Sequence, residues 1–95
     1  MTVASLMNTY ARTHFAVAAG KGVWLTDGEG RTYLDCVQGI ATNALGHAHP
    51  RLVAALTEQA QKIWHVSNIF REPAQEELSR RLVEASFADV VFFAA

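Results

Sequence analysis

The pattern of apolar and polar positions predicts a β-hairpin in the first half of the chain. Residues 23–26 are Val-Trp-Leu-Thr, which suit a pleated surface, and residues 32–35 read as the returning strand. Residues 27–30, Asp-Gly-Glu-Gly, provide a turn with glycines that can take positive φ. We therefore expect a hairpin over about 22–35. Residues 1–19 are expected to form an amino-terminal arm, part of it a short helix or an ordered tail.

The pattern changes to a helical period in the second half. Pro50 suits the first turn of a helix, and apolar residues then recur on one helical face at Leu52, Val53, Leu56, Ala60, Ile63 and Trp64. This predicts an amphipathic helix over about 51–64. After a connector, Pro73 begins a second predicted helix over about 73–87. Its expected buried side consists of Leu78, Leu82 and Ala85.

Residues 90–93, Val-Val-Phe-Phe, form a continuous apolar run. Such a run is typical of a strand that is buried on both faces. A strand of this kind needs sheet neighbours and covering helices, and the hairpin is too small to provide them. We therefore expect the chain to stop, as if cut, where an α/β domain begins.

Residues 39–50, GIATNALGHAHP, separate the hairpin from the helices. The stretch is too rich in glycine for a helix interior, and its apolar residues do not alternate as in a half-buried strand. Small side chains with polar neighbours usually indicate close packing. The predicted loop could pack against another subunit, a ligand or the rest of a domain.

Composition and charge narrow the class of protein. The chain has 95 residues, of which 51% are hydrophobic and 18% charged, so it is globular in type and forms one domain at most. A net charge of −1 gives no reason to expect nucleic acid or an anionic membrane as a partner. The single cysteine, Cys36, excludes an internal disulfide and fits a reducing, cytoplasmic compartment. No stretch approaches the roughly 20 apolar residues of a membrane-spanning helix.

The polar residues that could support chemistry favour structural roles. His47 and His49 could bind a metal, but a single His-x-His is a weak signal, and an imidazole bonded to backbone in a tight turn is the favoured interpretation. No metal site is expected. Asp27 and Asp35 suit a turn and a strand end better than a catalytic carboxylate pair.

Three further side chains, those of Trp24, Cys36 and Trp64, are expected to pack against other apolar groups rather than to take part in chemistry. Trp24 and Trp64 are interpreted as core or interface aromatics. Cys36 is interpreted as a small buried residue.

Seven short segments follow one another in a characteristic order and spacing. They are residues 7–12 (MNTYAR), 20–25 (GKGVWL), 27–30 (DGEG), 33–35 (YLD), 39–50 (GIATNALGHAHP), 67–68 (SN) and 91–93 (VFF). None is specific alone, but the ordered set resembles the amino-terminal part of the class III pyridoxal-phosphate aminotransferases. The resemblance extends over nearly the whole chain from Met7 onward.

The resemblance implies an α/β fold of the fold type I kind, with a large domain around a mostly parallel sheet and a smaller domain. This chain would supply the amino-terminal small-domain segment, a hairpin and two helices, plus the first strand of the large domain. Residues 20–95 would then be a partial aminotransferase domain that ends before the cofactor site. The family implies pyridoxal 5'-phosphate, a homodimer with active sites at the subunit interface, and small amino and keto acids as substrates.

The resemblance also suggests roles for individual residues. Candidates for the substrate entrance are Tyr10, Ile40, Ser67, Asn68 and Phe70. Candidates for the subunit interface are Asn43, Gly46, His47 and His49. Plain packing remains the alternative for Ile40 and Phe70, and backbone bonding is the favoured alternative for Asn43.

Transamination needs a lysine that forms an imine with the cofactor. Lys21 lies in a glycine-rich turn and Lys62 on the polar side of a predicted helix, so both are expected to be solvated. The resemblance places the phosphate-binding turn and the catalytic lysine beyond residue 95. No catalytic and no cofactor-binding residue is therefore expected here, and this chain alone is predicted to be inactive.

Two hypotheses follow. The chain is the amino-terminal part of an enzyme that moves an amino group between N-acetylornithine and 2-oxoglutarate, as in arginine biosynthesis. Alternatively, it is a non-catalytic fragment that pairs with an intact aminotransferase subunit. Relatives with similar beginnings that act on ornithine, succinylated amines or 4-aminobutyrate keep the substrate open.

Overall fold

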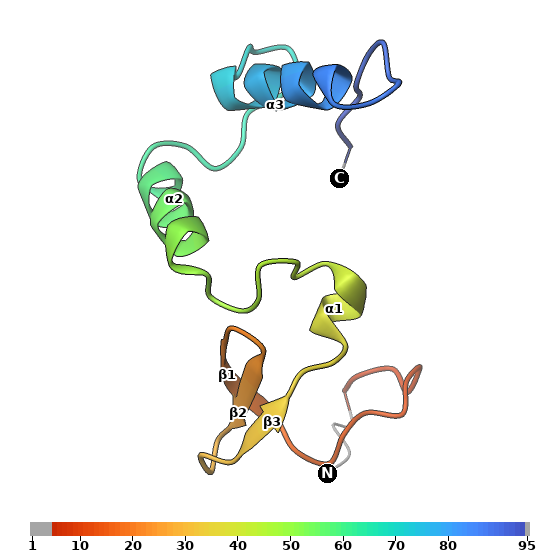
Figure 1. The fold of residues 1–95 in the computed structure, drawn as a ribbon, viewed down its shortest axis with the longest axis vertical. Helices are drawn as coiled ribbons and strands as arrows, with labels where there is room; N and C mark the ends of the chain where they lie inside the picture. Colours follow the sequence, from red (N-terminus) through yellow and green to blue (C-terminus); the bar gives the residue numbers. More distant parts are fainter. Residues whose placement is uncertain (1–4, 95) are drawn as a thin grey trace. The chain divides into compact units, whose positions relative to one another are not determined.

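The computed structural model describes residues 5–94 and contains three strands and three helices (Figure 1). In chain order these are β1 (Val17–Lys21), β2 (Trp24–Asp27), β3 (Thr32–Leu34), α1 (Gln38–Ala41), α2 (Pro50–Ala60) and α3 (Pro73–Glu84). The chain separates into two compact units, one up to residue 58 and the other from residue 59 on, and each is described by itself. The first four residues of the expected arm, and Ala95, lie outside the described residues.

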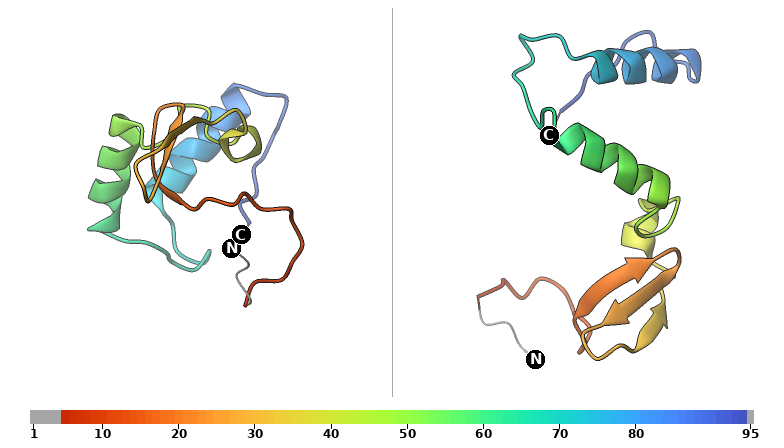
Figure 2. Two further views of the ribbon diagram at one scale, coloured as in Figure 1. Left: turned by 90° about the horizontal axis from the view of Figure 1, so that it is seen from below. Right: turned by 90° about the vertical axis from the view of Figure 1, so that its left-hand side faces the viewer.

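The three strands form one antiparallel sheet in the order β1-β2-β3 (Figure 2). The expected hairpin is present as β2 and β3, with Trp24 opposite Leu34. The strand β1 is an addition, because residues 17–19 had been assigned to the arm. It pairs Lys21 with Trp24 and Val17 with Asp27, with an irregular register between them. Its sequence, Val-Ala-Ala-Gly-Lys, has mostly poor strand formers, so only the free edge of β2 makes it a strand.

The helix α2 begins at Pro50, as predicted, but ends at Ala60 rather than near residue 64. The indole Nε1 of Trp64 donates a hydrogen bond of 2.6 Å to the backbone oxygen of Ala60. In a continuing helix the backbone amide of Trp64 would bond that same oxygen. The side chain thus takes over the carbonyl at the helix end, and the backbone turns away.

The helix α3 begins at Pro73 and ends at Glu84, three residues before the predicted end. At its start the carboxylate of Glu72 accepts the amides of Ala74 at 3.1 Å and Gln75 at 2.7 Å. At its end the hydroxyl of Ser86 donates to the backbone oxygen of Leu82 at 2.7 Å. Serine side chains compete with the backbone in this way, which ends the helix.

The strand predicted over residues 90–93 is not formed, and this prediction is wrong for the chain as described. None of the residues from 90 to 94 belongs to a strand. A strand is defined by hydrogen bonds to a neighbouring strand, and the three described strands pair only with one another. The apolar run favours a buried strand, but the described residues contain no further strand with which it could pair.

Within residues 5–94 no apolar side chain is buried, and the only buried residue is Asp27, at 4% exposure. The faces of α2 and α3 that were predicted to be buried are therefore open, and Leu56 is 71% exposed. Cys36, Trp24 and Trp64 are also exposed, so the prediction of a buried Cys36 is wrong, and neither tryptophan lies in a core. No described helix is long and apolar enough to span a membrane.

Candidate functional site

Asp27 organises the turn between β2 and β3. Its Oδ1 accepts the amides of Glu29 at 2.9 Å and Arg31 at 3.0 Å. Its Oδ2 accepts Nε of Arg31 at 2.8 Å and the hydroxyl of Tyr33 at 3.0 Å. The side-chain hydrogen bond from Arg31 is the main reason why the pKa of Asp27 falls to about 2. All the acceptor capacity of this carboxylate is used to hold the turn, as the sequence favoured.

Asp35, directly after β3, joins two parts of the chain. Its Oδ1 accepts the backbone amides of Val37 and Gln38, both at 2.9 Å. Its Oδ2 lies 2.6 Å from Nε2 of His47. The Gln38 amide and then the His47 ring lower the pKa of Asp35. A strand-end role was predicted, but the partner twelve residues further along was not.

His47 also fixes the loop over residues 39–50 to the hairpin. Its backbone exchanges two hydrogen bonds with Gly22, at 2.9 and 2.8 Å. A Cβ added at Gly46 would lie 2.8 Å from the backbone oxygen of Gly22, and one added at Gly20 would lie 2.8 Å from the His47 side chain. The close packing expected of this loop is therefore made, on this side, with the sheet of the same unit.

The helix α1 is a left-handed turn. Its four residues have positive φ: 50° at Gln38, 64° at Gly39, 60° at Ile40 and 61° at Ala41. This conformation costs roughly 1–2 kcal/mol for each residue other than glycine, and it is a marked outlier for a β-branched residue. Ile40 nevertheless adopts it with 86% of its surface exposed. Only Gly39 hinted at this turn in the sequence.

Two other loop residues use the backbone. Nδ1 of His49 accepts the amide of Arg51 at 3.2 Å, near the start of α2. The backbone oxygen of Asn43 accepts the amide of Gly46 at 2.9 Å. The bond of His49 is of the kind expected for a histidine in a tight turn, whereas the bond of Asn43 uses only its main chain and leaves the role of its side chain a prediction. No group of three potential metal ligands occurs within residues 5–94.

Tyr10, a candidate entrance residue, lies in the first unit beside a wide, open hollow. Phe15, Arg31 and Asp27 line the same hollow. The Arg12 guanidinium carbon lies 5.8 Å from the centre of the Tyr10 ring, within the range of a cation–π contact. Tyr10 is exposed, so its ring is available for a further contact.

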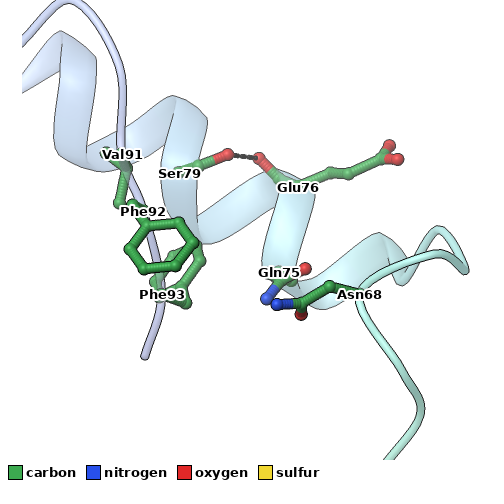
Figure 3. Close-up of a pocket in the computed structure, with 7 residues that line it drawn as sticks. All are labelled: Asn68, Gln75, Glu76, Ser79, Val91, Phe92 and Phe93. Atoms are coloured by element: carbon green, nitrogen blue, oxygen red, sulfur yellow. Dashed lines mark hydrogen bonds between the residues drawn. The ribbon is translucent and has the colours of Figure 1, made fainter. Parts of the chain in front are cut away.

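Asn68, another candidate, lines a hollow of about 240 Å³ in the second unit (Figure 3). Its amide lies beside that of Gln75, from α3, while Phe92 and Phe93 form the other side of the hollow. Ser67 and Phe70 belong to the adjacent turn, in which the amide of Phe70 donates to the backbone oxygen of Ser67 at 2.9 Å. Phe70 itself is exposed.

The described residues do not provide what pyridoxal 5'-phosphate needs. Lys21 and Lys62 are both exposed, and neither lines one of the two hollows. An imine-forming lysine must instead be held beside its cofactor in a shaped and desolvated site.

Comparison with known proteins identifies the family to which the chain is similar. Residues 6–95 match the family described as aminotransferase class-III. The acetylornithine aminotransferase of Mesorhizobium japonicum is 55% identical over 93 residues, which are 98% of this chain and 23% of that protein. Acetylornithine aminotransferase 2 of Caulobacter vibrioides is 59% identical over 88 residues, which are 93% of this chain and 22% of that protein. The chain thus spans less than a quarter of the length of these relatives.

Solved structures agree. The N-acetylornithine aminotransferase of Stenotrophomonas maltophilia matches with a TM-score of 0.81 and 43% identity, covering 87% of this chain and 23% of that one. An ornithine aminotransferase of Toxoplasma gondii matches with a TM-score of 0.84 and 28% identity, covering 92% of this chain and 20% of that one. From the family match over nearly its whole length, the chain belongs to the class-III aminotransferases.

Proposed function

We propose that the chain forms the amino-terminal part of an enzyme that moves an amino group between N-acetylornithine and 2-oxoglutarate, a step of arginine biosynthesis. The main support is the identity of 55% and 59% to two proteins named acetylornithine aminotransferase, over nearly the whole chain. Among the solved structures, an acetylornithine aminotransferase from Elizabethkingia anophelis and an ornithine aminotransferase from Toxoplasma gondii match equally, at 28% identity. The acetylated substrate is therefore supported by the relatives of higher identity, which include the N-acetylornithine aminotransferase of Stenotrophomonas maltophilia at 43%.

The same proposal includes the assembly. The whole enzyme would have the fold type I architecture, bind pyridoxal 5'-phosphate, form a homodimer and act in the cytoplasm. Asn43, Gly46, His47 and His49 would support the subunit interface by shaping the loop. The open apolar faces of α2 and α3 support this view, because such surface is normally covered in a finished protein.

The entrance for the substrate would be built from Tyr10, Ile40, Ser67, Asn68 and Phe70. Tyr10, Ile40 and Phe70 are all large and exposed, which supports a contact with something outside this chain. Ile40 has the additional support of its strained backbone, since such strain often marks functional positions.

A chimera tests this function. The matching residues of the Mesorhizobium japonicum enzyme are replaced by this chain, and glutamate formation is measured with pyridoxal 5'-phosphate present. We expect turnover with N-acetylornithine, at a higher kcat/KM than with ornithine or 4-aminobutyrate. The unchanged relative is the control. A folded dimeric chimera that prefers another donor would overturn the substrate assignment, and one with no transamination would overturn the function.

A second function is favoured by the complete lack of buried apolar side chains within residues 5–94. The chain could act by pairing with an intact aminotransferase subunit. Co-expression with the tagged, full-length relative tests this, with an unrelated tagged protein as control. Recovery of the chain with both proteins alike, or undiminished recovery of a Gly46→Val variant, would contradict pairing through the loop.

A further inference from the structure

The Asp35 carboxylate joins the turn α1 to the loop that contains His47. One oxygen accepts the amides that lead into α1, and the other meets the His47 ring. We propose that Asp35 and His47 are positioning residues that hold the left-handed turn α1 in the conformation that presents Ile40 to the amino donor. This inference rests on the proposed function for the role of Ile40, but the latch itself stands on geometry.

The turn needs such a latch because nothing beneath it is buried. A left-handed conformation at Gln38, Ile40 and Ala41 persists only where the surroundings over-determine it. In most proteins a packed core would do this, but the described unit has no buried apolar side chain. Hydrogen bonds must therefore do it. Bonds that involve a charged group are about twice as strong as neutral ones, and the Asp35 carboxylate accepts both amides that lead into the turn as well as facing the His47 ring.

The other end of the latch is anchored to the sheet. The backbone of His47 is bonded to Gly22 in both directions, and its side chain packs on Gly20, where even a methyl group would not fit. The backbone of His47 is therefore tied to the hairpin, and its imidazole lies against Gly20. Asp35 and His47 thus connect α1 to β1 and to the turn that follows it.

Local bonds within α1 assist but do not replace this anchor. The hydroxyl of Thr42 donates to the backbone oxygen of Gly39 at 2.9 Å, and Nε2 of Gln38 donates to that of Asp35 at 3.2 Å. Both bonds lie within a few residues of the turn and move with it. The contact of Asp35 with His47 adds a side-chain link between the turn and the loop that is bonded to the hairpin, beside the backbone bond of 2.8 Å from the Asp35 amide to the oxygen of Val23.

Hydrogen exchange in the chimera with the Mesorhizobium japonicum enzyme tests the latch without using activity. In Asp35→Ala, exchange of the amides of Val37 and Gln38 should accelerate by about tenfold or more, since each loses a charge-assisted hydrogen bond. His47→Ala should loosen the same amides, whereas His47→Gln, which can still donate to the carboxylate, should restore protection. Asp89→Asn is the matched control, since Asp89 is exposed and lies far along the chain. Unchanged exchange in Asp35→Ala and His47→Ala would overturn the latch.

Steady-state kinetics then test the positioning role. Asp35→Ala should raise KM for N-acetylornithine several-fold and change kcat less. In an Ile40→Ala background, Asp35→Ala should have little further effect on KM, because its effect passes through Ile40. Additive effects of the two substitutions would overturn positioning through Ile40. An inactive parent chimera would count against the proposed function alone, and exchange would still decide the latch.

Discussion

At the scale of the residue, Asp27 and Asp35 each lie at the end of a strand, but their carboxylates bond partners at different distances along the chain. The Asp27 carboxylate bonds residues of its own turn and Tyr33 of the returning strand β3, and its position in Asp-Gly-Glu-Gly predicts the turn role. Asp35 also has the predicted local bonds, but its second oxygen reaches His47. That contact depends on how the loop folds back, and no spacing rule in the sequence indicates it. Ile40 was a candidate by resemblance only, because nothing in its neighbours announces a left-handed isoleucine.

The lowered pKa of Asp27 predicts how the hairpin responds to acid. Because the pKa falls from 3.8 to about 2 on folding, the ionised carboxylate stabilises the folded turn. That stabilisation is complete above the unfolded pKa and is lost as the pH falls from 3.8 towards 2. Carboxyl-carbon NMR of the chimera with the Mesorhizobium japonicum enzyme should give a midpoint near 2 for Asp27. A midpoint near 3.8 would contradict the network, and Asp27→Asn, which cannot ionise, serves as control.

The contact of Gly46 with Gly22 predicts a costly substitution. In Gly46→Ala the new methyl group meets a backbone oxygen at 2.8 Å, at a φ of 79° that alanine rarely adopts. The conformation alone costs roughly 1–2 kcal/mol, and the contact adds to it. We expect a clearly lower melting temperature in the chimera. Gly28→Ala is the matched control, because no atom lies within 4 Å of its new methyl group. Equal melting temperatures would show that the loop does not dock as described.

At the scale of the element, starts were easier to predict than ends. Pro50 and Pro73 indicated where α2 and α3 begin, because proline is favoured in a first helical turn. The ends depend on the side chains of Trp64 and Ser86, which capture carbonyls that a longer helix would use. A hydrogen bond from such a side chain replaces the backbone bond that the next helical turn would make. The spacing of apolar residues does not indicate where this happens.

The carboxylate cap of α3 can be tested on its own. Glu72→Ala removes the acceptor for the amides of Ala74 and Gln75, and loss of an N-cap side chain costs about 1 kcal/mol. In a synthetic peptide of residues 70–87, circular dichroism at low temperature should show reduced helicity. Glu72→Asp, which keeps a carboxylate close to the same amides, is the control. Equal helicity of the alanine and parent peptides would refute the cap.

At the scale of the whole molecule, the helices α2 and α3 are present as expected, but the burial predicted for their apolar faces is not found within residues 5–94. Leu56, Leu78 and Leu82 lie on the predicted faces, yet all are exposed. Periodicity predicts which face an element will bury, whereas burial itself requires another element to cover it. The same reason explains why residues 90–93 form no strand.

The open faces predict the behaviour of the isolated chain. Burial of apolar surface is the main stabilising contribution to folding, and none of the described apolar side chains is buried. The purified 95-residue chain should therefore be oligomeric, insoluble or loosely folded, without a cooperative melt. Sedimentation velocity with thermal circular dichroism checks this. A monodisperse monomer with a sharp melting transition would contradict it.

We propose that this chain contributes to transamination only as part of a larger aminotransferase. The most direct measurement compares glutamate formation from N-acetylornithine and 2-oxoglutarate by two samples, the chimera and the chain alone. Each sample is first incubated with pyridoxal 5'-phosphate, and unbound cofactor is then removed. We expect turnover by the chimera and, for the chain alone, a rate no higher than that of a control with pyridoxal 5'-phosphate alone. Turnover by the chain alone that Lys21→Ala or Lys62→Ala abolishes, or a folded chimera without turnover, would contradict the claim.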